Sequence, residues 1–485
     1  MTSPHTCFDA LFRPNTIAVF GASTAGRGFA NDFIQATLKL GFTGEIYPIH
    51  PNATEIEGLK AYPTLDATPS PIDYAFIGIG ARHIPAILAA ANGRVKFAQV
   101  ISSGFGEMAD GGKALEAELV RAAHAGGMRL LGPNCLGTYS PGGRISYDRG
   151  TDGIVGPVGI ISQSGGLTRD LLRRGGRRGI RYSAVLSMGN CADLSPSDML
   201  EHFLDDPGTT VIGMYLEHIR DGRRFFEILR AAKARKPVVV LKGGRTQEGS
   251  RAAVSHTGAL AGDDRMWTAL ARQTGSILVD TLEQMLDQLL ILQHLTPNAD
   301  KPTHSIALFG NGGGTGVLAT DLFARNGLSV PRASDRTFAT LKAMELPPGT
   351  SLDNPYDTPS GTLKVEDGLV AETLLREIVE NESLDAMVVH INMPQFLNPN
   401  DRDRDVFGNL VRAAIRVREE SVGKTHFVLV LRSDGEPEIE ARKFEERNRA
   451  LEMGVPVFDE LPNAAVALAG LRDYEHYLNR RRGGT

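Results

Sequence analysis

The chain begins its first expected strand with Thr16-Ile17-Ala18-Val19-Phe20 and continues into Gly21-Ala22-Ser23-Thr24-Ala25-Gly26-Arg27-Gly28, and this stretch decides the fold. A short apolar run before a glycine-rich turn is typical of a buried strand leading into a helix, which we expect from about Phe29. Free backbone N–H groups at such a helix start can face a phosphate. Because the spacing is not Gly-x-Gly-x-x-Gly, a tight turn without a ligand explains the stretch about equally well.

The second expected strand indicates which nucleotide this first domain binds. It reads Glu45-Ile46-Tyr47-Pro48-Ile49-His50-Pro51-Asn52 and therefore ends in His50, Pro51 and Asn52. NAD-binding units usually place Asp or Glu at this end to hold the ribose hydroxyls. A carboxylate would repel the 3′-phosphate of coenzyme A, whereas His and Asn tolerate it. The pattern favours CoA and disfavours a nicotinamide dehydrogenase.

Three more strands are expected in this domain, over residues 74–80, 98–102 and 128–131. The carboxyl ends of parallel strands are where such folds bind ligands, and small or polar residues follow each of these strands. The candidate contacts to CoA in these loops are Ser102, Ser103, Gly104, Asn134 and Cys135. For Cys135, a small buried residue and a position near the CoA thiol are equally good interpretations.

A second domain is expected over residues 150–295, with strands at 157–162, 182–187, 211–216 and 237–241. The first of these leads into Ser164-Gly165-Gly166, a second glycine-rich helix start that can bind an anion. Glu217 follows the third strand and the loop holding His256 follows the fourth, so both emerge at one edge of the sheet. A carboxylate there can accept the imidazole N–H and raise the basicity of the other ring nitrogen. The alternatives are a surface charge for Glu217 and a helix cap for His256.

A third domain is expected over residues 304–475, after a polar linker at 295–303 with two prolines. Its first strand, residues 305–309, runs into a third glycine-rich helix start, Gly312-Gly313-Gly314-Thr315, with a helix from about Val317. Strands at 386–391, 426–431 and 455–458 complete another doubly wound unit. We expect the tail from Arg480 to be disordered.

The composition excludes several classes of protein. A chain of 485 residues is too long for one core, so two to four domains are expected. A net charge of −5 provides no basic field for nucleic acid or for a membrane surface. The three cysteines, Cys7, Cys135 and Cys191, form neither a disulfide framework nor a metal-site spacing. With no signal peptide and no apolar run of membrane-spanning length, we expect a cytoplasmic protein.

Three segments together resemble the acyl-CoA synthetases (NDP-forming), the superfamily of succinyl-CoA synthetase. Ser255-His256-Thr257-Gly258-Ala259-Leu260-Ala261-Gly262 is similar to the phosphohistidine segment of that superfamily. Gly132-Pro133-Asn134-Cys135 is similar to a loop of its CoA-binding domain, and Asn354-Pro355-Tyr356-Asp357 to a motif of its ligase domain. Their order matches the α subunit of ADP-forming acetyl-CoA synthetases. The resemblance implies an α/β fold with a Rossmann-like CoA-binding domain (8–140) followed by two flavodoxin-like doubly wound domains.

This resemblance implies an acid–CoA ligase that converts a small carboxylic acid, CoA and ATP to acyl-CoA, ADP and phosphate. His256 would accept the phosphoryl group, Glu217 would assist it, and the helix starts at Ser164–Gly166 and Gly312–Thr315 would flank it. We expect no ATP-grasp module in the chain, so ATP or ADP with Mg²⁺ would bind an ATP-grasp β-type subunit in a hetero-oligomer. The alternative is a CoA- or acyl-CoA-binding regulatory protein on the same scaffold. The sequence does not specify the acyl group.

Overall fold

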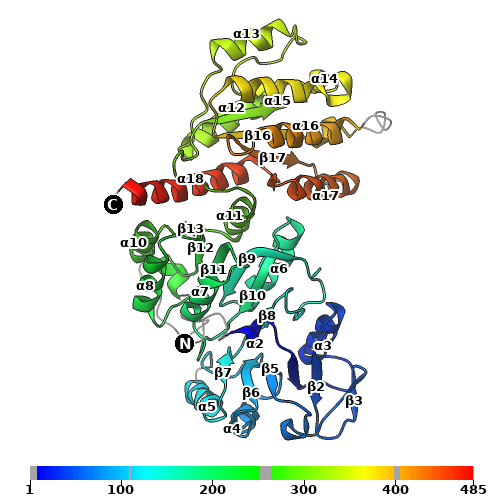
Figure 1. The fold of residues 1–485 in the computed structure, drawn as a ribbon, viewed down its shortest axis with the longest axis vertical. Coiled ribbons are helices and arrows are strands. Elements are labelled where there is room, and N and C mark those ends of the chain that lie inside the picture. The colour runs from blue at the N-terminus through cyan, green and yellow to red at the C-terminus, as the bar shows by residue number, and fades with distance from the viewer. Residues whose placement is uncertain (1–7, 109–110, 252–263, 398–404, 484–485) are drawn as a thin grey trace. The chain divides into compact units, whose positions relative to one another are not determined.

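The structure is a computed structural model that describes residues 8–108, 111–251, 264–397 and 405–483 (Figure 1). It divides into two compact units, residues 1–285 and 286–485. The described residues form three large sheets, two in the first unit and one in the second. The α/β fold class expected from the sequence is confirmed, and within the described residues no helix is both long and apolar enough to cross a membrane.

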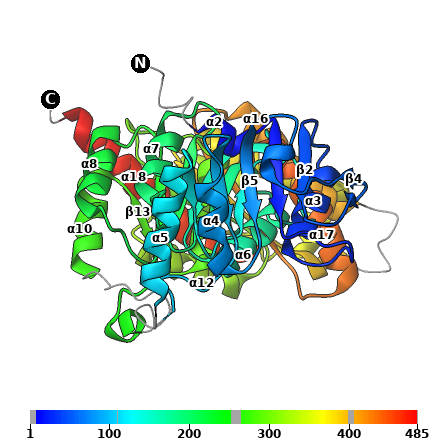
Figure 2. The same ribbon diagram turned by 90° about the horizontal axis from the view of Figure 1, so that it is seen from below.

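The first sheet is entirely parallel and has the order β2-β1-β5-β6-β7. Its strands are β1 (Thr16–Phe20), β2 (Glu45–Ile49), β5 (Ile72–Ile77), β6 (Val95–Val100) and β7 (Arg129–Leu131). The helices are α2 (Asp9–Phe12), α3 (Phe29–Lys39), α4 (Ile84–Ala89) and α5 (Gly112–Ala125), and a small hairpin pairs β3 (Glu55–Ile56) with β4 (Leu59–Lys60). Helices α4 and α5 lie side by side (Figure 2).

The second sheet has the order β13-β12-β11-β9-β10-β8, in which only the edge strand β8 is antiparallel to its neighbour. Its strands are β8 (Gly137–Tyr139), β9 (Val155–Ser162), β10 (Tyr182–Ser187), β11 (Val211–Leu216), β12 (Val238–Lys242) and β13 (Ile277–Val279). The helices are α6 (Gly165–Arg177), α7 (Pro196–Asp205), α8 (Gly222–Ala232) and α10 (Asp264–Thr274), and α11 (Leu282–His294) leads from this sheet into the second unit. The sequence did not predict the three-residue strands β8 and β13.

The sheet of the second unit is parallel and has the order β15-β14-β16-β17-β18. Its strands are β14 (Ile306–Gly310), β15 (Tyr356–Asp357), β16 (Ala386–Asn392), β17 (His426–Arg432) and β18 (Val457–Phe458). The helices are α12 (Gly313–Arg325), α13 (Asp335–Ala343), α14 (Ser360–Leu363), α15 (Val370–Asn381), α16 (Val406–Glu420), α17 (Pro437–Glu452) and α18 (Leu461–Gly483).

All three sheets share one strand order. Counting the parallel strands along the chain, each sheet reads 2-1-3-4-5, the doubly wound order of flavodoxin-like folds. Helices cover both faces of such a sheet, so its central strands are continuously apolar, as in β1, where Ile17, Ala18 and Val19 are fully buried. The chain leaves the sheet in opposite directions after the first and third strands. The crevice between these two strands is where doubly wound sheets bind ligands.

Two sequence predictions in the second unit differ from the structure. Helix α12 begins at Gly313 rather than near Val317, because the glycines themselves form its first turn. The prediction of a disordered tail from Arg480 is wrong, since α18 continues to Gly483. The side chain of Asn479 donates to the carbonyl oxygen of Ala299 (2.8 Å), and the guanidinium of Arg482 donates to Asp300 (2.6 Å). These contacts to the segment before β14 hold the end of the helix.

Candidate active site

The glycine-rich turn after β1 is a rigid cradle. Gly21 has a φ of +93°, and an added Cβ would lie 2.2 Å from the carbonyl oxygen of Gly78, so no larger residue fits there. The turn is held by Asn31, which is fully buried and exchanges two hydrogen bonds of 2.9 Å with the backbone of Ser23. Ala22 is buried, Gly26 is partly exposed and Arg27 is exposed, so the far side of the turn can be reached by a ligand.

The end of β2 carries His50, as the sequence indicated, but a carboxylate reaches the cradle from elsewhere. His50 accepts backbone N–H groups from Asn52 (3.2 Å) and Ala53 (2.9 Å) at Nδ1, which leaves Nε2 to carry the proton of the neutral ring. Glu57, in the β3–β4 hairpin, accepts a 2.7 Å hydrogen bond from Asn31. Sequence reasoning missed Glu57 because the hairpin has no strand pattern that would place it there.

The two other candidate CoA loops meet each other. The hydroxyl of Ser102 donates to the carbonyl oxygen of Ile79 (2.5 Å), and the backbone N–H of Asn134 donates to the carbonyl oxygen of Ser102 (3.1 Å). Ser103 is exposed beside them, and Gly104 is held by a bond from its N–H to Glu107. These contacts place both loops at the carboxyl edge of the first sheet.

Cys135 lies beneath these loops rather than on their surface. Its thiol is 2 % exposed and approaches the carbonyl oxygens of Val100 (3.5 Å) and Leu131 (3.6 Å). Burial raises the pKa of the thiol well above its ordinary value. Of the two interpretations left open by the sequence, this environment favours a packing role.

Glu217 is buried at the carboxyl edge of the second sheet, in the crevice between the first and third parallel strands. Its backbone N–H donates to Oε1 of Gln163 (2.6 Å), and the N–H of His218 donates to the same oxygen (3.0 Å). The hydroxyl of Tyr215 donates to its carboxylate (3.1 Å). Gln163 follows β9 directly, so one side chain joins the ends of β9 and β11. The sequence analysis assigned Gln163 no role.

Lys242 completes this edge from the end of β12. Its ammonium donates to the carbonyl oxygens of Glu217 (2.9 Å) and Gly243 and lies 5.7 Å from the centroid of the Trp267 ring. Burial lowers the pKa of Lys242, while the negative charge of Glu217 opposes this shift. The sequence shows only a lysine after an apolar run, and its burial becomes visible in the folded chain.

The helix starts at α6 and α12 look alike in sequence but differ in structure. At α6, Ser164 caps the helix by accepting the N–H of Leu167 (3.4 Å), and a Cβ on Gly166 would meet no atom within 4 Å. At α12, the N–H of Gly312 already donates to the carboxylate of Asp357 (2.7 Å). At α6 the N–H groups of Ser164 and Leu167 are bonded to the hydroxyls of Ser162 (3.3 Å) and Ser164, so Gly165 and Gly166 carry the donors that can face an anion, whereas a carboxylate already lies at the start of α12.

The remaining candidates at α12 flank this carboxylate. A Cβ added at Gly313 would lie 3.0 Å from the carboxylate of Asp357, whereas a Cβ added at Gly314 would lie in open space. Thr315 lines a small pocket together with Asp357 and His390. His390 is 6 % exposed, and its Nε2 has no hydrogen-bond partner among the described residues.

His256 itself lies outside the described residues, but both ends of its loop are described. The loop leaves the sheet at Lys242 and the chain re-enters it through α10, which begins at Asp264. The guanidinium of Arg245 forms ion pairs with Asp264 and with Asp280. The loop is thus anchored at the same edge of the sheet that holds Glu217.

Two family models match the chain: a CoA binding domain over residues 15–141 and a succinyl-CoA ligase like flavodoxin domain over residues 155–292. With the three doubly wound sheets, these matches define a CoA-binding α/β protein of the succinyl-CoA ligase class. The chain is 33% identical over 470 residues to the α subunit of acetate–CoA ligase (ADP-forming) I from Pyrococcus furiosus, covering 96% of both chains. It therefore belongs to the family of ADP-forming acid–CoA ligases.

Two further relatives show how the family is built. The chain is 36% identical over 361 residues to the acetate–CoA ligase (ADP-forming) I of Archaeoglobus fulgidus, covering 72% of this chain and 50% of that protein. The dinucleotide forming acetyl-coenzyme A synthetase 1 of Ca. Korarchaeum cryptofilum, solved with phosphate and ADP, superposes with a TM-score of 0.83 at 30% identity, covering 99% of each chain. The resemblance stated from the sequence is confirmed, and the ligase interpretation is favoured over a regulatory protein.

Proposed function

We propose that this chain is the α-type subunit of a ligase that forms acyl-CoA, ADP and phosphate from a carboxylic acid, CoA and ATP, with His256 carrying the phosphoryl group. The observation that carries the proposal is the buried Glu217, which Gln163 ties to the start of α6 at the edge where the His256 loop is anchored. A carboxylate there can accept one imidazole N–H and leave the other nitrogen as the nucleophile.

The proposed roles follow from charge. The terminal phosphoryl group of ATP moves to His256 and ADP leaves; the phosphoryl group then moves to the carboxylate of the acid, and the CoA thiol displaces phosphate. A phosphorylated imidazole is anionic, so the open start of α6 at Gly165 and Gly166 would stabilise it. At the start of α12 the carboxylate of Asp357 accepts the N–H of Gly312, and its negative charge would oppose a phosphoryl group there.

The first domain fits CoA in its donor set. The turn from Gly21 to Gly28 and the start of α3 offer backbone N–H groups to phosphate, His50 and Asn52 lie at the end of β2, and Ser102 and Asn134 line the neighbouring loops. Bound there, CoA would supply the thiol that accepts the acyl group.

We further propose an ATP-grasp subunit as partner, holding ATP and Mg²⁺, in a cytoplasmic hetero-oligomer. The relative from Pyrococcus furiosus is named an α subunit, and the match to the Archaeoglobus fulgidus ligase covers half of that protein. The three flavodoxin-like and Rossmann-like domains, at about 8–140, 150–295 and 304–475, would then present His256 to two separate sites, one on each chain.

The test is phosphoryl transfer in the reconstituted complex. The chain is co-expressed with an ATP-grasp partner, incubated with radiolabelled ATP and Mg²⁺, and assayed for acid-labile, base-stable label and for acyl-CoA. We expect label and turnover in the parent and neither in His256→Gln. Label that persists in His256→Gln contradicts the assignment of the acceptor, and CoA binding without label or turnover supports the regulatory alternative.

A further inference from the structure

A pocket of about 520 Å³ lies beside Glu217 at the carboxyl edge of the second sheet. It is formed between α8 and α10, which pack against each other (Figure 1). This volume is in the range of sites that bind small organic ligands. Acetate would leave most of it empty.

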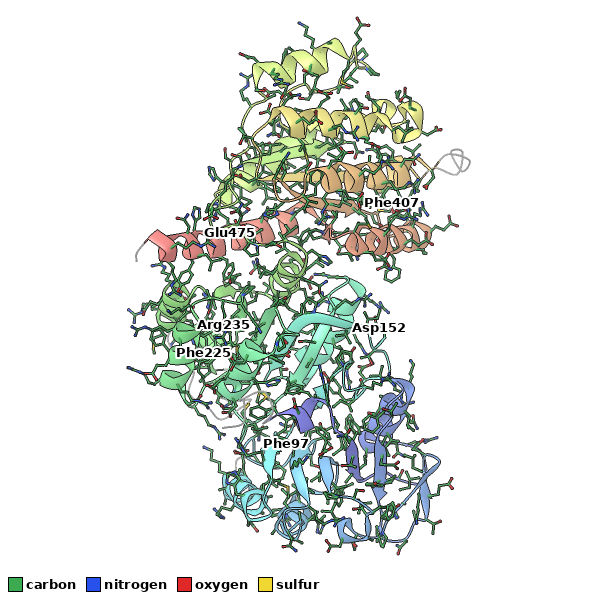
Figure 3. All side chains as sticks on the ribbon, in the orientation of Figure 1. Phe97, Asp152, Phe225, Arg235, Phe407 and Glu475 are labelled. Carbon is green, nitrogen blue, oxygen red and sulfur yellow. The ribbon has the colours of Figure 1, made fainter. Side chains whose placement is uncertain are left out.

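The walls of the pocket are aromatic and aliphatic. Phe225, labelled on α8 in Figure 3, is 1 % exposed, and its ring centroid lies 6.2 Å from that of Trp267 on α10. Phe226 and Leu270 line the pocket from the same two helices, and Met266 lines it while remaining 69 % exposed. Such walls stabilise a ligand by burying its apolar surface.

The polar groups of the pocket lie together at one end. Lys242 is the one Lys or Arg among the described residues that line the pocket, and it is 5 % exposed. Two of its three N–H donors are used on the carbonyl oxygens of Glu217 and Gly243, which leaves one for a ligand oxygen as far as the described residues extend. The one buried cation, which lies beside the carboxylate of Glu217, suits at most one carboxylate on a ligand; a second carboxylate would be buried against apolar walls without a partner among the described lining residues.

We propose that this pocket binds the acid substrate, and that the substrate class is monocarboxylic acids with an aromatic or branched aliphatic chain rather than acetate or a dicarboxylate. The acid's carboxylate lies near Lys242 and Glu217, and its chain lies between Phe225, Phe226 and Trp267. This assignment rests on the proposed ligase function, because it places the acid beside the group that would assist His256.

The protein contains its own reporter for this site. Trp267 is the only tryptophan in the chain and lines the pocket, so tryptophan emission reports on the pocket without any ligase reaction. The full-length chain is titrated with phenylacetate, isovalerate, acetate, succinate and phenethyl alcohol. We expect saturable changes with phenylacetate and isovalerate, and at least about 10-fold weaker binding of the other three, the factor expected for losing methylene contacts or the charged group.

A variant that fills the pocket distinguishes binding in the pocket from a nonspecific effect of the acids on Trp267 emission. Gly222, the first residue of α8, lines the pocket, and an added Cβ would meet no atom within 4 Å. Gly222→Leu should weaken phenylacetate binding at least about 10-fold, the range for crowding one apolar group in a pocket. Gly361→Leu, at an equally open position in α14, should change nothing.

Three binding results overturn the proposal: unchanged phenylacetate binding in Gly222→Leu, phenethyl alcohol binding as tightly as phenylacetate, and acetate or succinate binding more tightly than the larger acids. A fourth result also overturns it: turnover of acetate by the reconstituted complex while Trp267 emission does not respond to the larger acids. The last of these leaves the ligase function intact. Conversely, a change in Trp267 emission with phenylacetate, without ligation of any acid by the complex, contradicts the proposed ligase function and supports the proposal that the pocket binds such acids.

Discussion

Glu217 shows how a single residue acquires its environment from distant parts of the chain. Its side chain accepts from Tyr215, its backbone N–H is fixed by Gln163, and its carbonyl oxygen holds Lys242. Burial lowers the pKa of Lys242, and the negative charge of Glu217 opposes that shift.

We predict that Glu217→Gln keeps the fold and lowers the rate of His256 phosphorylation by about 10²-fold, the size of effect seen when a base-assisting group is lost. The amide oxygen can still accept from Tyr215, and the bonds to Gln163 and Lys242 use the backbone. The measurement is the initial rate of labelling, with thermal unfolding as a check on the fold. Glu227→Gln, which changes an exposed carboxylate on α8, is the control and should leave both the labelling rate and the thermal unfolding unchanged. An unchanged rate in Glu217→Gln would show that Glu217 is only structural.

At the scale of elements, the three glycine-rich helix starts differ in the side chains around them. The start of α3 follows a turn fixed by the buried Asn31, and the start of α6 is capped by Ser164 and otherwise open. The start of α12 binds Asp357, whose negative charge complements the helix dipole. The same sequence feature therefore has a carboxylate bound to it in one place and a serine cap in another.

We predict that Asp357→Ala lowers the free energy of unfolding of the second unit by about 1–2 kcal/mol, because α12 loses both a charged hydrogen-bond acceptor and its dipole partner. Urea denaturation followed by circular dichroism measures this. Asp321→Ala, an exposed position further along α12, provides the matched control and should change the value by less than about 0.5 kcal/mol. Equal stabilities of the two variants would mean that Asp357 does not stabilise the helix start.

At the scale of the whole molecule, one strand order is repeated in three sheets, and each candidate site lies in the crevice between the first and third strands. Gly21 follows β1 and Gly78 follows β5; Gln163 follows β9 and Glu217 follows β11. In the third sheet, Asn311 follows β14 and accepts the N–H of Asn392 at the end of β16 (2.9 Å). The topology thus brings residues far apart in sequence to one edge of each sheet.

The second unit should be sensitive to mild acid. Burial lowers the pKa of His390 from 6.5 to about 4, so between these values the unfolded chain binds a proton that the folded chain does not. Stability is then complete above pH 6.5 and falls as the pH decreases toward 4. We predict a loss of about 2 kcal/mol between pH 7 and pH 5 from this one group.

Urea denaturation at the two pH values checks this prediction. His390→Gln should remove about 2 kcal/mol of the difference between pH 7 and pH 5, whatever its effect on stability at pH 7. His304→Gln, at an exposed position before β14, should leave the difference unchanged. A pH dependence that survives in His390→Gln would assign it to other groups, of which His294, whose pKa burial also lowers to about 4, is the first to replace.

The sequence by itself determined the fold class, the positions of the long strands and the family. Buried parallel strands are continuous apolar runs bounded by glycine, so Thr16–Phe20, Tyr182–Ser187 and Val211–Leu216 could be read with their observed bounds. It also placed Glu217 at a sheet edge, because a strand end is a local property. Local patterns carry this information, since they depend on neighbours within one turn or one strand.

Only the tertiary structure decided how the site is built. The bonds of Gln163 to the backbone after β11, the position of Lys242 beside Trp267, and Asp357 at the start of α12 join residues that are far apart in the chain. The same holds for the end of α18, which looks like a charged tail but is held by Ala299 and Asp300. A hydrogen bond or a pocket wall between distant segments leaves no periodic trace in either one, so it becomes visible only when the sheets are assembled.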